Sequence, residues 1–150
     1  MHAPLPATPH AGSHAGLKAL YAANVIVAAS AWAADMNRTH MFNPTWPPHA
    51  KFHDGITISL ASLTGAAGLY FLARQPFEAR VNTALGALMP ALFFGAQALA
   101  FLYPGARGIE AENPRLAPRV AGVRMNELPF SLAGLALAGI GYLLATKARR

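Results

Sequence analysis

The chain contains no cysteine and few charged residues. The absence of cysteine excludes thiol catalysis, disulfide bonds and thiolate metal sites. Only 12% of the 150 residues are charged, which is about half the usual share for a soluble domain. A soluble fold of this size needs a charged surface, and no segment alternates between apolar and polar residues as a half-buried strand does. The composition therefore indicates a helical membrane protein.

The net charge of +6 does not indicate a nucleic-acid binder. Proteins that bind nucleic acid gather Lys and Arg on one folded face, whereas here the basic residues flank apolar segments. That distribution is typical of a membrane protein whose ends contact anionic lipid. We therefore expect the lipid bilayer as a partner, and no nucleic acid.

Four apolar segments are long enough to cross a bilayer, since about 20 helical residues span ~30 Å of hydrocarbon. They cover residues 15–34, 55–73, 81–103 and 128–145. The short link at 74–80 makes the second and third helices antiparallel neighbours, so the two longer links emerge together at the other end. The sequence predicts an all-α fold with a flexible tail at 1–14 and a single domain at 15–150. That domain is a four-helix transmembrane bundle with a capping loop between its first two helices.

Small residues four apart allow helix backbones to approach closely in lipid. Three such pairs predict a compact bundle: Ala61 with Gly65, Ala91 with Gly95, and Gly134 with Ala138. Polar residues inside the spans are expected chiefly to form hydrogen bonds between helices, and these are Asn24, Asn82 and Gln97.

Orientation is predicted from the basic residues near the span ends. Lys and Arg are shared equally between the two sides of the bundle. The cluster of Lys147, Arg149 and Arg150 directly follows the last span, and the positive-inside rule then favours cytoplasmic termini.

Residues 37–55 concentrate the chemically capable side chains of the chain, with three histidines, two asparagines, one aspartate and one tryptophan. Pro47 and Pro48 form a natural helix start, so we extend the second helix back to about Pro48. His49 and His53 then stack on one helix face. Along that face Thr57 continues a polar track into the bundle, while Asp54 lies about 100° round the helix from His53.

Three interpretations of this stretch stay open. The first is a divalent metal site made by His40, His49 and His53, with a carboxylate from Asp54, Glu110, Glu112 or Glu127. The second is metal-free acid–base catalysis, because histidine titrates near neutrality and exchanges protons beside a carboxylate. The third is structural: the prolines and Trp46 shape a rigid cap, and the histidines and asparagines bond to the loop backbone.

The string N-R-T-H-M-F-N-P-T-W-P-P-H-A-K-F-H-D-G resembles the signature of a family of small, uncharacterised membrane proteins with four predicted spans. The resemblance implies the four-span fold and no settled activity. The layout is also similar to that of other four-helix membrane enzymes, such as cofactor-light oxygenases and sterol-isomerase-like proteins. None of their motifs is matched here, so that likeness is one of architecture alone.

The resulting hypothesis is a small membrane enzyme that acts on a lipophilic or amphipathic substrate entering from the bilayer. His49 and His53 are its predicted central groups, with His40 and Asp54 as their partners. Substrate positioning is assigned to Asn37, Asn43, Trp46 and Thr57. The alternative is a non-enzymatic accessory or binding subunit, which would dock a membrane partner or a second copy of the chain. A small transporter is the third hypothesis, although four spans are few for alternating access.

Overall fold

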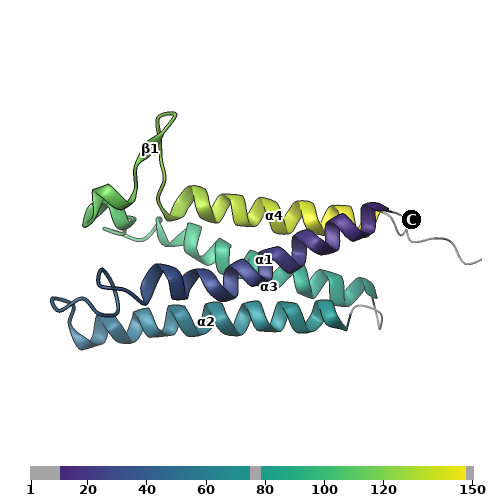
Figure 1. The fold of residues 1–150 in the computed structure, drawn as a ribbon, viewed down its shortest axis with the longest axis horizontal. Coiled ribbons are helices and arrows are strands. Elements are labelled where there is room, and N and C mark those ends of the chain that lie inside the picture. Colours follow the sequence, from purple (N-terminus) through teal and green to yellow (C-terminus); the bar gives the residue numbers. More distant parts are fainter. Residues whose placement is uncertain (1–10, 75–78, 148–150) are drawn as a thin grey trace, which may run out of the picture.

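Four long helices pack side by side in the computed structural model, which describes residues 11–74 and 79–147 (Figure 1). Helix α1 covers Ala11–Asp35, α2 covers Pro48–Ala73, α3 covers Ala79–Ala100 and α4 covers Glu127–Lys147. Both long links lie at one end of the bundle, and the start of α1 lies with the end of α4 at the other end (Figure 1). The predicted all-α four-helix bundle is confirmed. Residues 1–10 of the predicted tail lie outside the described residues.

All four helices are long and apolar enough to cross a membrane, with mean hydropathies of 1.4 to 1.8. Large apolar side chains cover much of their outer surface, and Leu63 and Leu143 are 67% and 62% exposed. Such side chains are unfavourable in water but suit lipid. The chain is therefore a multi-pass membrane protein by the length and composition of its helices.

The helix starts follow from local sequence. Pro47 is extended and Pro48 opens α2, as predicted, because proline lacks the N–H that a first helical turn leaves unpaired. At the start of α4, the Asn126 side-chain oxygen accepts the N–H of Leu128 at 3.1 Å. The carboxylate of Glu127 lies in the first turn of α4, where it complements the positive end of the helix dipole.

Helix α1 contacts each of the other three helices, and it meets α3 across the centre of the bundle. Two of the predicted small-residue pairs lie in close interfaces. A side chain at Gly65 would meet the backbone of Ala28, and one at Gly134 would meet the ring of Phe94. Gly95 does not have this role, because no atom of the described residues lies within 4 Å of a Cβ built there.

The side chain of Asn24 is polar and fully buried within the bundle. Its amide nitrogen donates to Leu20 O at 2.9 Å within α1 and to Gly86 O of α3 at 2.8 Å. Its oxygen lies against Gly68 of α2, in the space that a Cβ there would occupy. This one side chain therefore joins three helices, and the predicted hydrogen bonding between helices is confirmed for it.

The link between α3 and α4 is folded rather than extended. It contains two short 3₁₀ helices, η1 at Ile109–Ala111 and η2 at Pro114–Leu116, and a hairpin of β1 Arg119–Val120 with β2 Val123–Arg124. The turn residues Ala121 and Gly122 both have positive φ, at 49° and 82°. Such a two-residue turn matches the twist of paired strands. The sequence analysis did not predict this hairpin, because two-residue strands are too short to show alternation.

Candidate functional site

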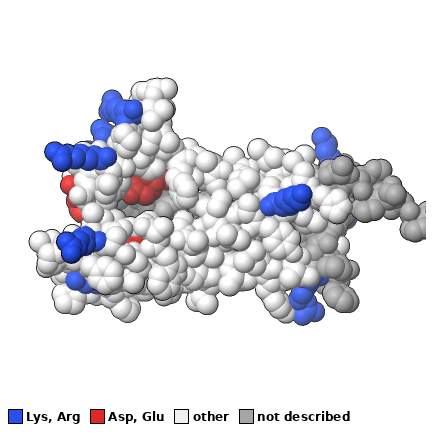
Figure 2. All heavy atoms as spheres, in the orientation of Figure 1, with Lys and Arg blue, Asp and Glu red and all other residues white. Residues whose placement is uncertain are grey.

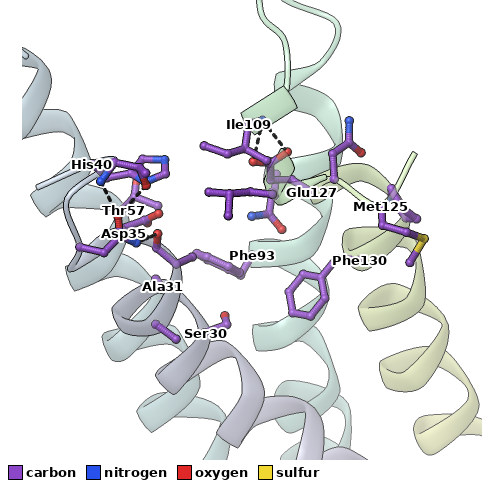
Figure 3. A pocket seen from close by; sticks show the side chains of 18 of the residues that line it. Ser30, Ala31, Asp35, His40, Thr57, Phe93, Ile109, Met125, Glu127 and Phe130 are labelled. Carbon is purple, nitrogen blue, oxygen red and sulfur yellow. Dashed lines mark hydrogen bonds between the residues drawn. The ribbon is translucent and has the colours of Figure 1, made fainter. Parts of the chain in front are cut away.

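A cavity of about 850 Å³ opens where the long links meet the bundle. It lies between the end of α1, the second half of α3 and the start of α4, and the surface is visibly hollowed there, with acidic side chains inside (Figure 2). Much of its wall is apolar, formed by Ala31, Phe93, Phe130 and Ala133. Most of the polar groups lie on two facing walls (Figure 3).

One polar wall contains Asp35 and His40 (Figure 3). The turn between them is shaped by Asn37, whose amide nitrogen donates to Ala34 O and whose oxygen accepts the N–H and the hydroxyl of Thr39 at 2.8 and 2.6 Å. These bonds end α1 and bring the loop back over the cavity. The amide of Asn37 thus shapes the loop, as in an Asx turn.

Asn43 repeats this arrangement six residues later. Its oxygen accepts the N–H and the hydroxyl of Thr45 at 3.0 and 2.8 Å, and its nitrogen donates to Thr39 O at 3.2 Å. The two Asn-x-Thr triplets therefore form one connected cap. Within the described residues, these contacts match the structural interpretation of both asparagines.

The hydrogen bonds around Thr39 assign the tautomer of His40. Thr39 Oγ1 lies 2.6 Å from Asn37 Oδ1 and 2.9 Å from His40 Nδ1. Since Asn37 Oδ1 is only an acceptor, the single hydroxyl proton goes to it, and His40 Nδ1 must donate to Thr39. The neutral His40 ring then has a free lone pair on Nε2, which makes this atom a proton acceptor at the cavity.

Asp54 lies behind this wall, on the inward face of α2. Its side chain is 9% exposed, and its Oδ2 atom has no hydrogen-bond partner among the described residues. The carboxyl group of Asp35 lies within electrostatic range of Asp54, His40 and Glu127. Three carboxylates and one imidazole, from three helices and a loop, therefore act on the same end of the cavity.

The facing wall is built on Glu127 and Ile109 (Figure 3). The two carboxylate oxygens of Glu127 lie 3.0 and 3.2 Å from the N–H of Ile109, so the first residue of α4 holds η1 in place. A side chain at Gly108 would strike the carboxylates of Glu127 and Glu110. A larger residue at this position would therefore require the two carboxylates and the amide of Asn126 to shift.

Two further amides complete this wall. Asn126 donates to Glu110 Oε2 at 2.9 Å, and this hydrogen bond is the main reason that the pKa of Glu110 is lowered from its ordinary 4.5. The hydroxyl of Ser131 lies 2.7 Å from Gln97 Oε1. Ser131 Oγ also lies 2.7 Å from Glu127 O, and its single proton cannot serve both acceptors. Gln97 therefore contributes an amide group to the cavity lining.

A second, outer hollow of about 400 Å³ adjoins the cavity. It is lined by Trp46, Arg107 and Glu112 among others, and it shares His40, Ile109 and Glu127 with the cavity. Those three shared residues form a partition between an outer polar space and an inner apolar one. Polar groups on the partition can thus exchange protons with water while they face an apolar cavity.

The predicted central pair lies elsewhere. The Nε2 atoms of His49 and His53 are 3.1 Å apart, as expected for stacked positions on a helix. Both side chains are exposed, and the ring of His49 also stacks on Phe52 at 6.0 Å. Neither histidine lines the cavity or the outer hollow, so the structure brings this pair together but not with His40.

The other predicted site residues divide between the two spaces. Asn37 and Thr57 line the cavity, while Trp46 lines the outer hollow and packs edge-on against His40 at 5.2 Å. Among residues 11–74 and 79–147 no group of three or more His, Asp or Glu side chains is arranged to hold a metal ion. The metal interpretation of His40, His49 and His53 stays a prediction.

Asp35 was not predicted from the sequence as a site residue, and Gln97 was not assigned to the site. A signal for Asp35 was present, because it is an acidic residue at the last position of an apolar span. No local pattern pairs Asp35 with Glu127, since 91 intervening residues separate them and only the folded link brings η1 and α4 to the cavity.

Comparison with known proteins gives a family without an assigned activity. No curated protein and no solved structure matches the chain. A family model described as a family of unknown function, DUF6640, matches residues 11–150. The match spans every helix described above, and the chain belongs to this family, which agrees with the uncharacterised family expected from its sequence.

Proposed function

We propose that this protein is a small membrane enzyme that binds a lipophilic or amphipathic molecule in the 850 Å³ cavity and moves a proton on its polar end. The observation that supports this most is the combination of apolar walls with Asp35, His40 and Glu127 in one cavity. Its volume falls in the range of small-molecule sites, roughly 300–1,000 Å³. Its position at the end of the spans gives a hydrocarbon chain access from the bilayer.

His40 is the proposed proton-transfer group. Its Nε2 lone pair is free when Nδ1 donates to Thr39, and its ring faces the cavity with Glu127 opposite (Figure 3). A base of this kind takes a proton from one atom of the bound molecule and returns it to another, which requires no other reactant. Asp54 and Asp35 stabilise the imidazolium that forms in between.

Host cells that express the protein provide the test. Lipid extracts from cells with wild type, His40→Gln and empty vector are compared by untargeted mass spectrometry. We expect one lipophilic species to change with wild type and to stay unchanged with His40→Gln. Purified His40→Gln protein should still retain the molecule in native mass spectrometry, since glutamine preserves size and polarity.

The double variant His49→Ala/His53→Ala is the matched comparison, because both of its imidazoles lie outside the cavity. If it abolishes the change while His40→Gln does not, the reaction centre is at the predicted pair and our assignment is wrong. If wild type binds a molecule but alters no lipid, the enzyme proposal fails.

An accessory subunit is the second candidate, and the hairpin is the observation that favours it. Val120 and Val123 are 57% and 54% exposed on β1 and β2, which project from the bundle (Figure 1). Exposed apolar side chains on such a projection suit a partner subunit. Replacing both valines by threonine should release a co-purifying membrane protein if this candidate is correct.

A further inference from the structure

Among the described residues, the cavity lining has two carboxylates and no Lys or Arg. Asp35 and Glu127 line it, Asp54 lies behind Asp35, and the residues that form its walls include no Lys or Arg. Among the described residues, His40 is the one lining side chain able to become positive. Carboxylates in a partly apolar space are costly unless a positive group or a proton accompanies them.

The nearby basic residues do not supply that group. Arg107 lines the outer hollow rather than the cavity, and Arg107 and Arg124 act on Glu110 at the outer surface. Within residues 11–74 and 79–147, the Oδ2 atom of Asp54 has no hydrogen-bond partner, and its side chain is only 9% exposed. Among the described residues, the wall made by α1 and α2 therefore has carboxylates and no Lys or Arg to accompany them.

We infer that the ligand of this cavity is an amphiphile with a protonated amine at its polar end. The inference rests on the proposed function, since it names the ligand chemistry for the same cavity. An ammonium group at Asp35 or Glu127 would donate a charge-assisted hydrogen bond to that carboxylate, which is about twice as strong as a neutral one. The other carboxylate would add attraction at longer range. The hydrocarbon body would lie against Phe93, Phe130 and Ala133, and the amide of Gln97 would be available to a polar group beside the nitrogen.

Three probes of equal chain length test this charge complementarity. The full-length protein in lipid nanodiscs is titrated with N,N-dimethyldodecylamine, dodecanol or dodecanoic acid, and one-to-one complexes are counted by native mass spectrometry. We expect the amine to bind about tenfold more tightly than the alcohol, and the acid to bind most weakly because the carboxylates repel it.

The variants isolate the carboxylates. Asp35→Asn with Glu127→Gln should reduce the preference for the amine over the alcohol to less than about twofold, while the glutamine still accepts the N–H of Ile109. Glu112→Gln is the control, because it removes a carboxylate of the outer hollow and not of the cavity; the amine preference should persist. If the double variant does not fold, Asp35→Asn alone gives the same comparison with a smaller expected loss.

Two results separate this inference from the proposed function. If the alcohol binds as tightly as the amine, and Ala133→Phe displaces both, then the cationic ligand is wrong and the cavity remains a binding site. Ala133 suits this test because it lines the cavity and is exposed, so a larger side chain fills the space without entering the core. If Ala133→Phe displaces none of the probes, then both proposals fail.

Discussion

The contact between Asn24 and Gly68 predicts that Gly68→Ala strongly destabilises the protein, and that it does so only while Asn24 is present. In Gly68→Ala the new Cβ would occupy the position of Asn24 Oδ1 and would lie 2.9 Å from Nδ2. Asn24 is fully buried, so its side chain can only move by giving up the 2.8 Å bond to Gly86 O. An interhelical hydrogen bond in a membrane is worth about 0.6 kcal/mol on average and up to ~1.7. Overpacking adds roughly 1–3 kcal/mol, so we expect a loss of about 2–4 kcal/mol in the free energy of unfolding.

The same substitution in a protein that already contains Asn24→Ala tests this reasoning directly. In Asn24→Ala the space beside Gly68 is empty, so Gly68→Ala should there be neutral or stabilising by up to about 1 kcal/mol, the ordinary gain of alanine over glycine in a helix. Gly95→Ala is the matched control, because nothing lies within 4 Å of its Cβ, and it should also be neutral or stabilising. Unfolding of purified protein by sodium dodecyl sulfate in mixed micelles measures all of these variants. Equal losses from Gly68→Ala in both backgrounds would refute the contact.

Three further predictions concern the link and the orientation. Glu127→Ala removes the acceptor of the Ile109 backbone N–H in η1. Hydrogen exchange of residues 108–112 should then become at least about tenfold faster. Unchanged exchange would contradict the role of Glu127 in holding η1. The pKa of Glu110 is lowered from 4.5 in the folded protein, first by its bond from Asn126. The ionised Glu110 carboxylate therefore contributes fully to the stability of the link above pH 4.5, and this contribution is lost as the pH falls further. Hydrogen exchange measured from pH 6 down to 3 should show the loss in wild type and not in Glu110→Gln. Because the chain has no cysteine, single cysteine variants report the orientation directly. If the termini are cytoplasmic, a membrane-impermeant maleimide added to cells should label Ala106→Cys and not Lys147→Cys. The reverse labelling pattern would show the opposite orientation.

The fold was predictable because each helix is a long apolar run, and residue types that favour a helix start mark the beginnings of α2 and α4. Pro48 opens α2 where the proline pair predicted it, and α4 begins beside Asn126, a residue type that caps helices. The hairpin was not predictable, since its turn requires a positive φ at Ala121, a conformation for which alanine has no preference.

The site was predicted in part, and the reason lies in helix geometry. The spacing of His49 and His53 correctly gives two neighbouring rings, but helical periodicity says which residues share a face and not which face is inward. The adjacent position, Asp54, is the one that turned out to be buried. His40 was identified because the composition of its loop is unusual. Asp35 and Glu127 come to line one cavity only after the links have folded, and no local spacing in the sequence shows such a long-range arrangement.

The central position of Asn24 also sets an order for assembly during synthesis. Its partner Gly86 follows 62 residues later in the chain, so at about 5–20 residues per second α1 waits roughly 3–12 s before that carbonyl has been made. During the interval the amide can use Leu20 O of its own helix but has one hydrogen unpaired in lipid. The first two helices therefore form an incomplete pair that only the arrival of the third can close, and mutations in α3 near Gly86 should act on biogenesis before they act on the mature protein.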